Sequence, residues 1–157
     1  MRCLIVGAGA VGQVYGYHLV QGGAEVSYLV KDKYAESARH GFTLYPLNEK
    51  DARQNPILFD KFSVLTNAQQ VAQQSWDYVF LTTSSTALRA DDWYAELAKA
   101  IGRAQVIILT VGIEDLAFVK RYTREKHIIT GLITMMSYAA PLPGEEVARP
   151  GTAYWFP

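Results

Sequence analysis

The chain has 157 residues, about the length of one domain, and its 15 basic and 15 acidic residues balance to a formal net charge of zero. This balance argues against binding to nucleic acid or to an anionic membrane surface, because both depend on basic patches. Apolar residues make up 50% of the chain and charged residues 19%, so it can bury a core and is not a disordered segment.

Cys3 is the single cysteine, which excludes an internal disulfide and is typical of a reducing compartment. The longest apolar runs, such as 106–109 and 128–136, are much shorter than the roughly 20 residues of a membrane span. The N-terminus lacks the long apolar region and the cleavage site of a secretory signal. We therefore expect a cytoplasmic protein without a membrane segment.

Strands and helices alternate along the first half of the sequence. Continuous apolar runs predict strands buried on both faces, and apolar residues at three- and four-residue spacings predict helices. The expected elements are a strand at 3–6, a helix at 10–20, a strand at 24–30, a short helix at 33–40, strands at 42–45 and 62–65, and a short helix at 71–75. We expect the strands at 42–45 and 62–65 to pair with each other around a polar loop.

The second half continues the same alternation. The expected elements are a strand at 78–81, a helix at 90–101, a strand at 106–109, a helix at 114–122, a β-rich run at 128–136, and a hairpin that turns at Pro150 and Gly151. Together these elements predict an α/β, Rossmann-like fold: a doubly wound, mostly parallel sheet with helices on both faces, ending in an antiparallel hairpin.

The sequence stops directly after the apolar residues Tyr154, Trp155 and Phe156. One interpretation is that residues 1–157 are a cofactor-binding domain cut from a longer protein. The other is that the terminal strand simply lies within the sheet. An exposed apolar end of this kind would also favour self-association, for example as a homodimer.

The most informative segment is Gly7-Ala8-Gly9-Ala10-Val11-Gly12, a G-x-G-x-x-G motif between a buried strand and a helix. Gly7 permits the tight turn out of the strand, Gly9 lets the backbone approach a pyrophosphate, and Gly12 lets the helix pack closely on the strand. The phosphates would lie at the helix N-terminus, where free N–H groups and the helix dipole favour negative charge. The motif predicts a dinucleotide site.

The residues after the second strand bear on the choice of dinucleotide. An acidic residue at this point binds the ribose hydroxyls of NAD, and a basic residue meets the 2′-phosphate of NADP. Lys31 and Lys33 favour NADP, whereas Asp32 is the residue that NAD would use. We expect NADP, with NAD as the less favoured alternative.

Two further loops follow sheet strands at the edge where ligands bind in such folds. The hydroxyls of Thr82, Thr83 and Ser84 either contact the cofactor or cap the next helix. Val111 and Gly112 form the second loop, where the glycine would admit the nicotinamide half. Glu114 and Asp115 follow in a first helical turn, and we interpret them as structural because a carboxylate would repel phosphate.

The remaining reactive residues form no recognisable site. His18, His40 and His127 are scattered without the spacing of metal ligands, so we expect no metal site. We interpret His18 as a packed or hydrogen-bonded residue and Cys3 as a small buried apolar one.

The chain resembles the N-terminal domain of the ketopantoate reductases (2-dehydropantoate 2-reductases). The resemblance covers essentially the whole chain. It rests on the glycine motif with Gly16, on Lys31, on residues 77–81, on 111–113 and on the closing segment 144–147. It implies an enzyme of pantothenate biosynthesis in which NADPH delivers hydride to a 2-keto acid. It also implies a second, helical domain, absent from this chain, that supplies the catalytic lysine and a substrate-binding acid, so we assign no catalytic residue here.

Two positions depart from the family pattern. Ser84 stands where the family usually has a lysine, and Val111 where it usually has an asparagine, and both family residues contact cofactor or substrate. Losing a hydrogen bond to a charged group costs roughly 1.5–3 kcal/mol. Ketopantoate itself is therefore in doubt as the substrate, and a non-catalytic, dinucleotide-sensing module stays open as an alternative. An FAD enzyme is disfavoured because the second strand ends in lysine instead of glutamate.

Overall fold

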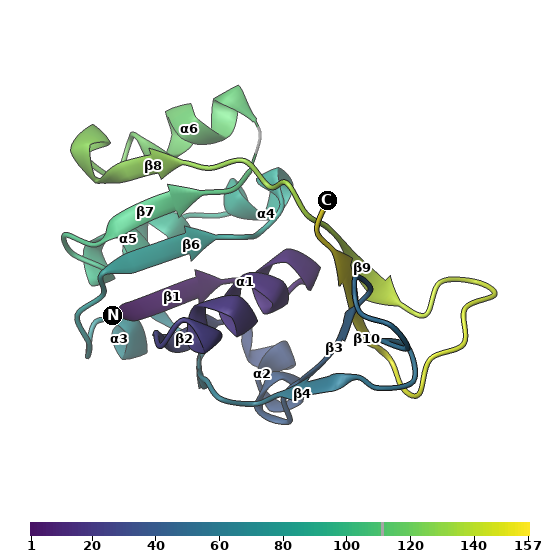
Figure 1. Cartoon of the computed structure of the whole chain (residues 1–157). Coiled ribbons are helices and arrows are strands. Elements are labelled where there is room, and N and C mark those ends of the chain that lie inside the picture. Colours follow the sequence, from purple (N-terminus) through teal and green to yellow (C-terminus); the bar gives the residue numbers. More distant parts are fainter. Residues whose placement is uncertain (111) are drawn as a thin grey trace.

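The computed structural model describes residues 1–110 and 112–157. Within these residues the main sheet has six parallel strands in the order β5-β2-β1-β6-β7-β8. Their bounds are β1 (Arg2–Val6), β2 (Glu25–Leu29), β5 (Ser63–Leu65), β6 (Tyr78–Leu81), β7 (Gln105–Ile108) and β8 (Ile128–Thr130). The strand order reverses direction at β1, and all six strands end at the same edge of the sheet (Figure 1). This arrangement confirms the predicted Rossmann-like, doubly wound α/β fold.

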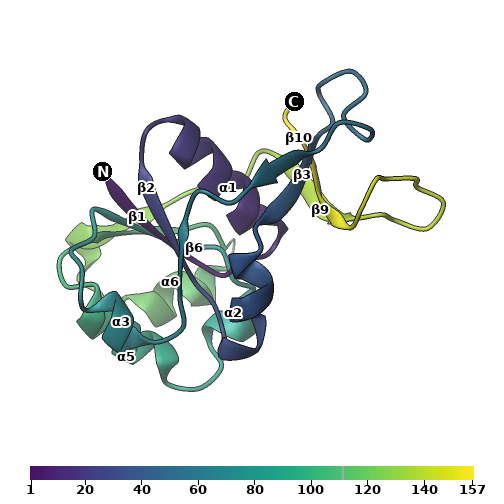
Figure 2. The ribbon, with the colours of Figure 1, turned by 90° about the horizontal axis from the view of Figure 1, so that it is seen from below.

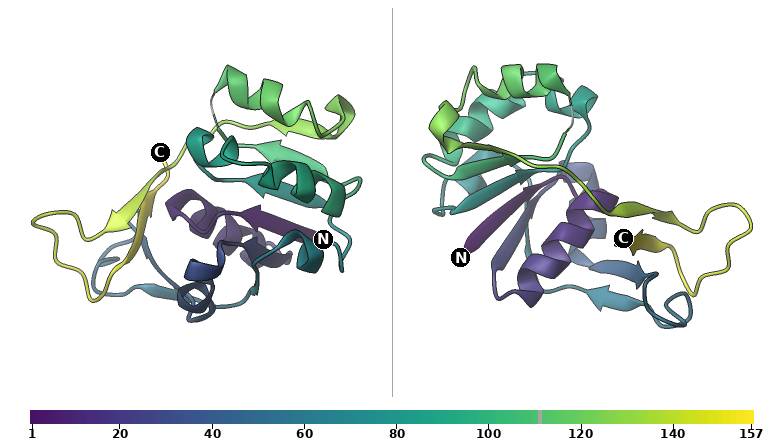
Figure 3. Two further views of the ribbon diagram at one scale, coloured as in Figure 1. Left: turned by 180° about the vertical axis from the view of Figure 1, so that it is seen from behind. Right: turned by 45° about the horizontal axis from the view of Figure 1, so that its top comes forward.

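Helices cover both faces of the main sheet (Figure 3). On one face lie α1 (Ala10–Gln21) and α2 (Asp32–Arg39), whose buried residues share a core with Cys3 and Ile5 of β1. On the other lie α3 (Ala68–Val71), α4 (Ser85–Leu88), α5 (Trp93–Ala100) and α6 (Ile113–Val119), packed with Leu4 and Val6. Since successive residues of β1 point to opposite faces, its apolar run supplies both cores.

A second, four-stranded sheet lies beyond the carboxyl ends of the parallel strands, against α1 (Figures 1 and 2). Its order is β4-β3-β10-β9, with bounds β3 (Phe42–Pro46), β4 (Ile57–Phe59), β9 (Met136–Ala140) and β10 (Gly151–Trp155). β10 pairs parallel with β3 on one side and antiparallel with β9 on the other. This inner position buries Tyr154, whereas Trp155 and Phe156 stay partly exposed.

The predicted pairing of the strands at 42–45 and 62–65 is wrong. β5 joins the main sheet beside β2, with Ser27 opposite Ser63. β3 pairs instead with β10 and with β4, a three-residue strand that was not among the predicted elements. Periodicity indicates that a segment is a strand, but it does not say which partner the strand takes.

The predicted C-terminal antiparallel hairpin is confirmed, but its first strand is not the predicted segment 147–149. Residues 147–149 are not a strand, and the partner of β10 is β9, so residues 141–150 form a long exposed loop.

The β-rich run expected at 128–136 divides into β8 and the first residue of β9. The helix expected at 90–101 is α5 alone, with α4 as a separate turn before it, and the short helix at 71–75 lies earlier, as α3. The helix expected at 114–122 is α6, which ends earlier at Val119, before a short 3-10 turn (Glu125–His127).

Candidate dinucleotide site

The glycine loop begins where β1 ends. Gly7 has a φ of +99°, a conformation that favours glycine, and a Cβ there would lie 3.0 Å from Thr83 Cγ2. The Gly7 N–H donates to the Leu29 carbonyl oxygen of β2 at 3.0 Å. The turn therefore starts at a fixed position between β1 and β2, the strands that a bound dinucleotide would cross.

The N-terminus of α1 is open to an anion. Among the described residues, no side chain caps this end of α1 and no acidic residue stands in its first turn. A Cβ on Gly9, the N-cap residue, would meet no atom within 4 Å. The first-turn N–H groups of a helix lack partners within the helix, and the dipole adds partial positive charge. The residues around Gly9 thus fit a phosphate, which would take the space that the missing side chain leaves.

Gly12 and Gly16 serve packing instead. A Cβ on Gly12 would overlap the Gly7 carbonyl oxygen and lie 2.7 Å from Thr82 Oγ1. Gly16 lies on the Tyr28 hydroxyl, which donates to the Gly12 carbonyl oxygen at 2.9 Å. Burial raises the pKa of Tyr28 far above its usual value, so this hydroxyl keeps its proton and remains a donor. These contacts hold α1 close against β1 and β2.

One residue that sequence reasoning missed is Gln13, in the second turn of α1. Its amide nitrogen donates to the Ala8 carbonyl oxygen at 2.8 Å, and its amide oxygen accepts from the buried Thr152 hydroxyl at 2.7 Å. Gln13 therefore links the glycine loop to β10 of the second sheet. A glutamine inside an otherwise apolar helix face was the available signal, but its distant partner Thr152 was not foreseeable.

The hydroxyl loop after β6 divides between the two predicted roles. The Thr82 hydroxyl lies 2.9 Å from the carbonyl oxygens of Val6 and Gly7 and so fixes the glycine loop. The Ser84 hydroxyl accepts from the Ala87 N–H at 3.2 Å and caps α4, as the capping interpretation anticipated. The Thr83 hydroxyl oxygen is buried and has no hydrogen-bond partner among the described residues. A buried hydroxyl without a partner marks a place that a polar ligand group could satisfy.

The loop after β7 contains a second such hydroxyl, because Thr110 Oγ1 is also buried without a partner in the described part of the chain. The predicted site residue Val111 lies outside the described residues. Gly112 is the N-cap of α6, and a Cβ on it would lie 2.7 Å from Asp115 Oδ2. A side chain at Gly112 would therefore collide with Asp115, which explains the glycine without a ligand.

Asp115 is fully buried, and its surroundings support the structural interpretation of this residue. The Ser85 hydroxyl donates to Oδ2 at 2.5 Å, and Arg89 Nε lies 3.3 Å from Oδ1. Arg89 also pairs with the exposed Glu114. These contacts join the start of α6 to α4, so they connect the loops that follow β7 and β6.

The predicted cofactor-selecting lysines lie at the carboxyl end of β2. Lys31 is the N-cap residue of α2 and is exposed, and Asp32 begins the helix. The Lys33 ammonium lies 4.8 Å from the centre of the Tyr34 ring. Because Val6 and Leu29 are paired in register, Lys31 follows β2 at the same sheet edge at which Gly7 follows β1.

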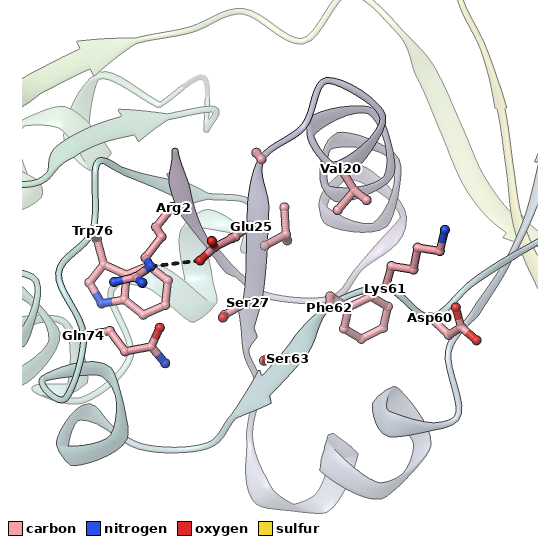
Figure 4. A pocket seen from close by; sticks show the side chains of 12 residues that line it. Arg2, Val20, Glu25, Ser27, Asp60, Lys61, Phe62, Ser63, Gln74 and Trp76 are labelled. Carbon is pink, nitrogen blue, oxygen red and sulfur yellow. Dashed lines mark hydrogen bonds and ion pairs between the residues drawn. The ribbon is translucent and has the colours of Figure 1, made fainter.

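The structure contains a groove beside α1 and a pocket at the amino edge of the main sheet. An apolar groove of about 430 Å³ lies beside the first turn of α1, lined by Val11, Leu47, Met135, Met136, Tyr138 and Trp155. A polar pocket of about 570 Å³ lies at the opposite edge, by the amino ends of β2 and β5 (Figure 4). Arg2 and Glu25 form an ion pair of 2.9 Å there. Ligands of doubly wound sheets bind at the carboxyl edge, so the pocket of Figure 4 is not the dinucleotide site.

The other reactive residues differ in their surroundings: Cys3 is in the core, and His18 is an exposed residue whose ring lies against aromatic neighbours. Cys3 is fully buried, and burial raises the pKa of its thiol. The His18 ring contacts Tyr154 and Phe156, with ring centres 5.7 and 5.2 Å apart. Among the described residues, no three His, Cys, Asp or Glu side chains gather as metal ligands would. None of the described helices is both long and apolar enough to cross a membrane.

Comparison with known proteins gives one family. The family model "Ketopantoate reductase PanE/ApbA" matches residues 3–152. No curated protein matches the chain.

Solved structures share the fold at low sequence identity. The 2-dehydropantoate 2-reductase of Methylococcus capsulatus is 19% identical with a TM-score of 0.67, and that of Geobacter metallireducens GS-15 is 22% identical with a TM-score of 0.67. D-mandelate dehydrogenase, solved with NADH and anilino(oxo)acetate, is 18% identical with a TM-score of 0.70. These matches cover 100%, 99% and 99% of this chain but 46%, 46% and 45% of those chains.

Proposed function

The chain belongs to the ketopantoate reductase family, and from this premise we propose that residues 1–157 are the dinucleotide-binding domain of an NADPH-dependent 2-keto-acid reductase. The observation that carries the proposal is the open N-terminus of α1, where Gly9 leaves space and the first turn has neither a side-chain cap nor an acid. A pyrophosphate fits that end because unpaired N–H groups and the helix dipole stabilise negative charge.

Several of the predicted site residues have a direct role in this proposal. The pyrophosphate binds at Gly9 and the first turn of α1, which Gly7 and Gly12 position by the turn and by close packing. Lys31 and Lys33 favour the 2′-phosphate of NADP over the bare ribose of NAD. Thr83 and Thr110, whose hydroxyls have no partner among the described residues, follow β6 and β7. These two strands lie on the side of β1 away from β2, where the nicotinamide half would lie. When bound, the cofactor supplies hydride to the keto carbon.

The remaining parts of the reductase lie outside this chain in our proposal. The chain spans less than half of the length of the solved structures that it matches. A further helical domain would contribute the catalytic lysine and the group that binds the substrate carboxylate. We therefore expect residues 1–157 alone to bind the dinucleotide, in a cytoplasmic setting, without turning over a 2-keto acid.

The test compares two glycines at opposite ends of α1. Gly9 and Gly22 both have negative φ, and neither would bring a new Cβ closer than 3.4 Å to another atom. Gly9→Ala should fold normally and weaken NADPH binding at least tenfold, because the methyl group takes the phosphate space. Gly22→Ala should fold and bind like the wild type. Calorimetric titration that shows no NADPH or NADH binding to the wild type, or equal binding to Gly9→Ala, contradicts the proposal.

A non-catalytic dinucleotide-sensing module is the second candidate. The observation that favours it is Ser84, whose hydroxyl is engaged in capping α4 at the position where family members carry a cofactor-contacting lysine. The full-length protein distinguishes the two functions. Oxidation of NADPH in the presence of ketopantoate or phenylglyoxylate supports the reductase. Tight NADPH binding without turnover of either acid supports the sensor.

A further inference from the structure

We propose that Asp115 is a positioning residue for the nicotinamide half of the dinucleotide, because it ties the loop after β6 to the loop after β7. This inference rests on the proposed function. It goes beyond that function by assigning a role to a buried carboxylate that contacts neither the glycine loop nor the charged residues after β2.

The contacts of Asp115 reach both loops. On its own side, Asp115 lies one turn after Gly112, and its backbone N–H donates to the Gly112 carbonyl oxygen at 3.0 Å. On the other side, Oδ2 accepts from the Ser85 hydroxyl at 2.5 Å, one residue after the Ser84 cap. Arg89 Nε lies 3.3 Å from Oδ1 and donates to the Ser85 carbonyl oxygen at 3.3 Å. One carboxylate therefore fixes the starts of two helices relative to each other.

Stability alone is a weak explanation for this arrangement. A fully buried carboxylate has a large desolvation penalty, and its cationic partner Arg89 is exposed to solvent, which weakens the ion pair. What a directional carboxylate adds is a defined geometry. The loops that it joins contain the hydroxyls of Thr83 and Thr110, which are buried without partners among the described residues. The Asp115 contacts thus fix the relative position of the two loops that carry these hydroxyls.

The expected effect is confined to one half of the cofactor. β6 and β7 lie on one side of β1, and β2 with Lys31 lies on the other. A dinucleotide whose pyrophosphate lies at the end of β1 places its adenosine ribose at the end of β2 and its nicotinamide on the opposite side. Loosening the Asp115 contacts should therefore weaken binding of the nicotinamide half and leave the adenine half unchanged.

The experiment measures the affinity of residues 1–157 for NADPH and for its adenine half, adenosine 2′,5′-bisphosphate, and repeats both with NADH and ADP. Asp115→Asn should lose about tenfold in affinity for the whole dinucleotide and less than twofold for the adenine half. Ser85→Ala should shift affinity in the same direction, and it leaves the carboxylate in place if Asp115→Asn fails to fold. Glu114→Gln is the matched control, since it alters the exposed partner of Arg89, and it should bind both ligands normally.

Two outcomes contradict the inference. Equal losses for the whole dinucleotide and for its adenine half would mean that Asp115 supports the fold in general. Unchanged affinities in both Asp115→Asn and Ser85→Ala would mean that the loops need no such tie. A wild-type chain that binds neither the dinucleotides nor their adenine halves is a different result, because it overturns the proposed function as well.

Discussion

The hydroxyl of Tyr28 fills the space that a side chain at Gly16 would need, and from there it donates to the carbonyl oxygen of Gly12 one turn earlier. Tyr28 of β2 can therefore lie against α1 because the helix has a glycine, Gly16, where it faces this ring. The contact fixes the height of α1 above the sheet and therefore the position of the helix N-terminus at which we propose that the pyrophosphate binds.

This relationship predicts coupling between two substitutions. Gly16→Ala should lower the free energy of unfolding by about 1–3 kcal/mol through overpacking, and Tyr28→Phe by about 1 kcal/mol through the lost hydrogen bond. Their double mutant should lose less than the sum, because removing the hydroxyl takes away the closest overlapping atom and leaves only the ring carbon Cζ, at 2.7 Å from the new Cβ. Urea unfolding of all four chains measures the coupling. Gly16→Ala with Tyr94→Phe, a buried tyrosine on the other face of the sheet, should be additive. Additivity in both pairs would refute the contact.

Gly12→Ala should be destabilising where Gly9→Ala is not. The new Cβ would overlap the Gly7 carbonyl oxygen, a backbone atom that cannot turn away. Forcing this overlap costs about 1–3 kcal/mol, which corresponds to a loss of about 2–4 °C in Tm per kcal/mol at this chain length. Thermal unfolding followed by circular dichroism measures Tm, and we expect the Tm of Gly12→Ala to be lower than that of Gly9→Ala. Equal melting temperatures would show that the helix can move away from β1 without cost.

Lys31→Ala should separate the two nicotinamide cofactors. If the ammonium of Lys31 meets the 2′-phosphate, its removal weakens NADPH binding by about tenfold and leaves NADH binding within twofold. Lys99→Ala, which removes an exposed lysine from α5, is the matched control. Fluorescence titration of the reduced nicotinamide gives both affinities. A loss of the same size for NADPH and NADH would sink the preference for NADP.

His18 predicts an acid-sensitive contribution to stability. His18 is exposed, but partial desolvation of its ring beside Tyr154 and Phe156 lowers the pKa of His18 below the usual value of about 6.5. Burial also raises the pKa of Tyr154 to about 12, so that this neighbour stays neutral. Below about pH 6.5 the unfolded chain binds a proton that the folded chain resists, so stability falls as the pH falls until folded His18 is protonated as well.

The measurement is Tm between pH 7 and pH 5 for three chains. His18→Gln should show a shallower decline than the wild type because it removes this titration. His40→Gln, whose ring in the wild type lies 2.8 Å from the Glu36 carbonyl oxygen on the exposed side of α2, should decline like the wild type. Parallel curves for the wild type and His18→Gln would contradict the assignment.

Local patterns were enough to predict the strand–helix–strand unit built around the glycine motif. The apolar run after Arg2, the turn at Gly7 and the helix that ends before Gly22 predicted β1, α1 and β2 with errors of one or two residues. The roles of Gly7 in the turn and Gly12 in close packing are confirmed by their backbone and contacts. The turn at Gly7 and the overlap of a Gly12 side chain with the Gly7 carbonyl oxygen are local, whereas the contacts of both glycines with Thr82 and Thr83 are not.

The second sheet could not be predicted, because its contacts join distant segments. Leu44 pairs with Thr152 across more than half of the chain, and the same Thr152 donates to Gln13. A strand pattern fixes which residues share a face, but the partner depends on the assembled fold. The burial of Asp115 could not be predicted either, because it also depends on contacts between distant segments. Its place in a first helical turn suggested a role at the dipole, and its ties to Ser85 and Arg89 appear when α4 and α6 are placed together.

The position of β10 has a consequence for how the chain tolerates cutting. β10 closes the second sheet from within, held by β3 on one side and β9 on the other, while the loop 141–150 that leads to it is exposed. A protease nick in that loop should leave the severed strand bound like a peptide in its groove, with Gln13 still joined to Thr152. Deleting the strand instead leaves two bare strand edges facing each other, which invites a neighbouring molecule to insert its own.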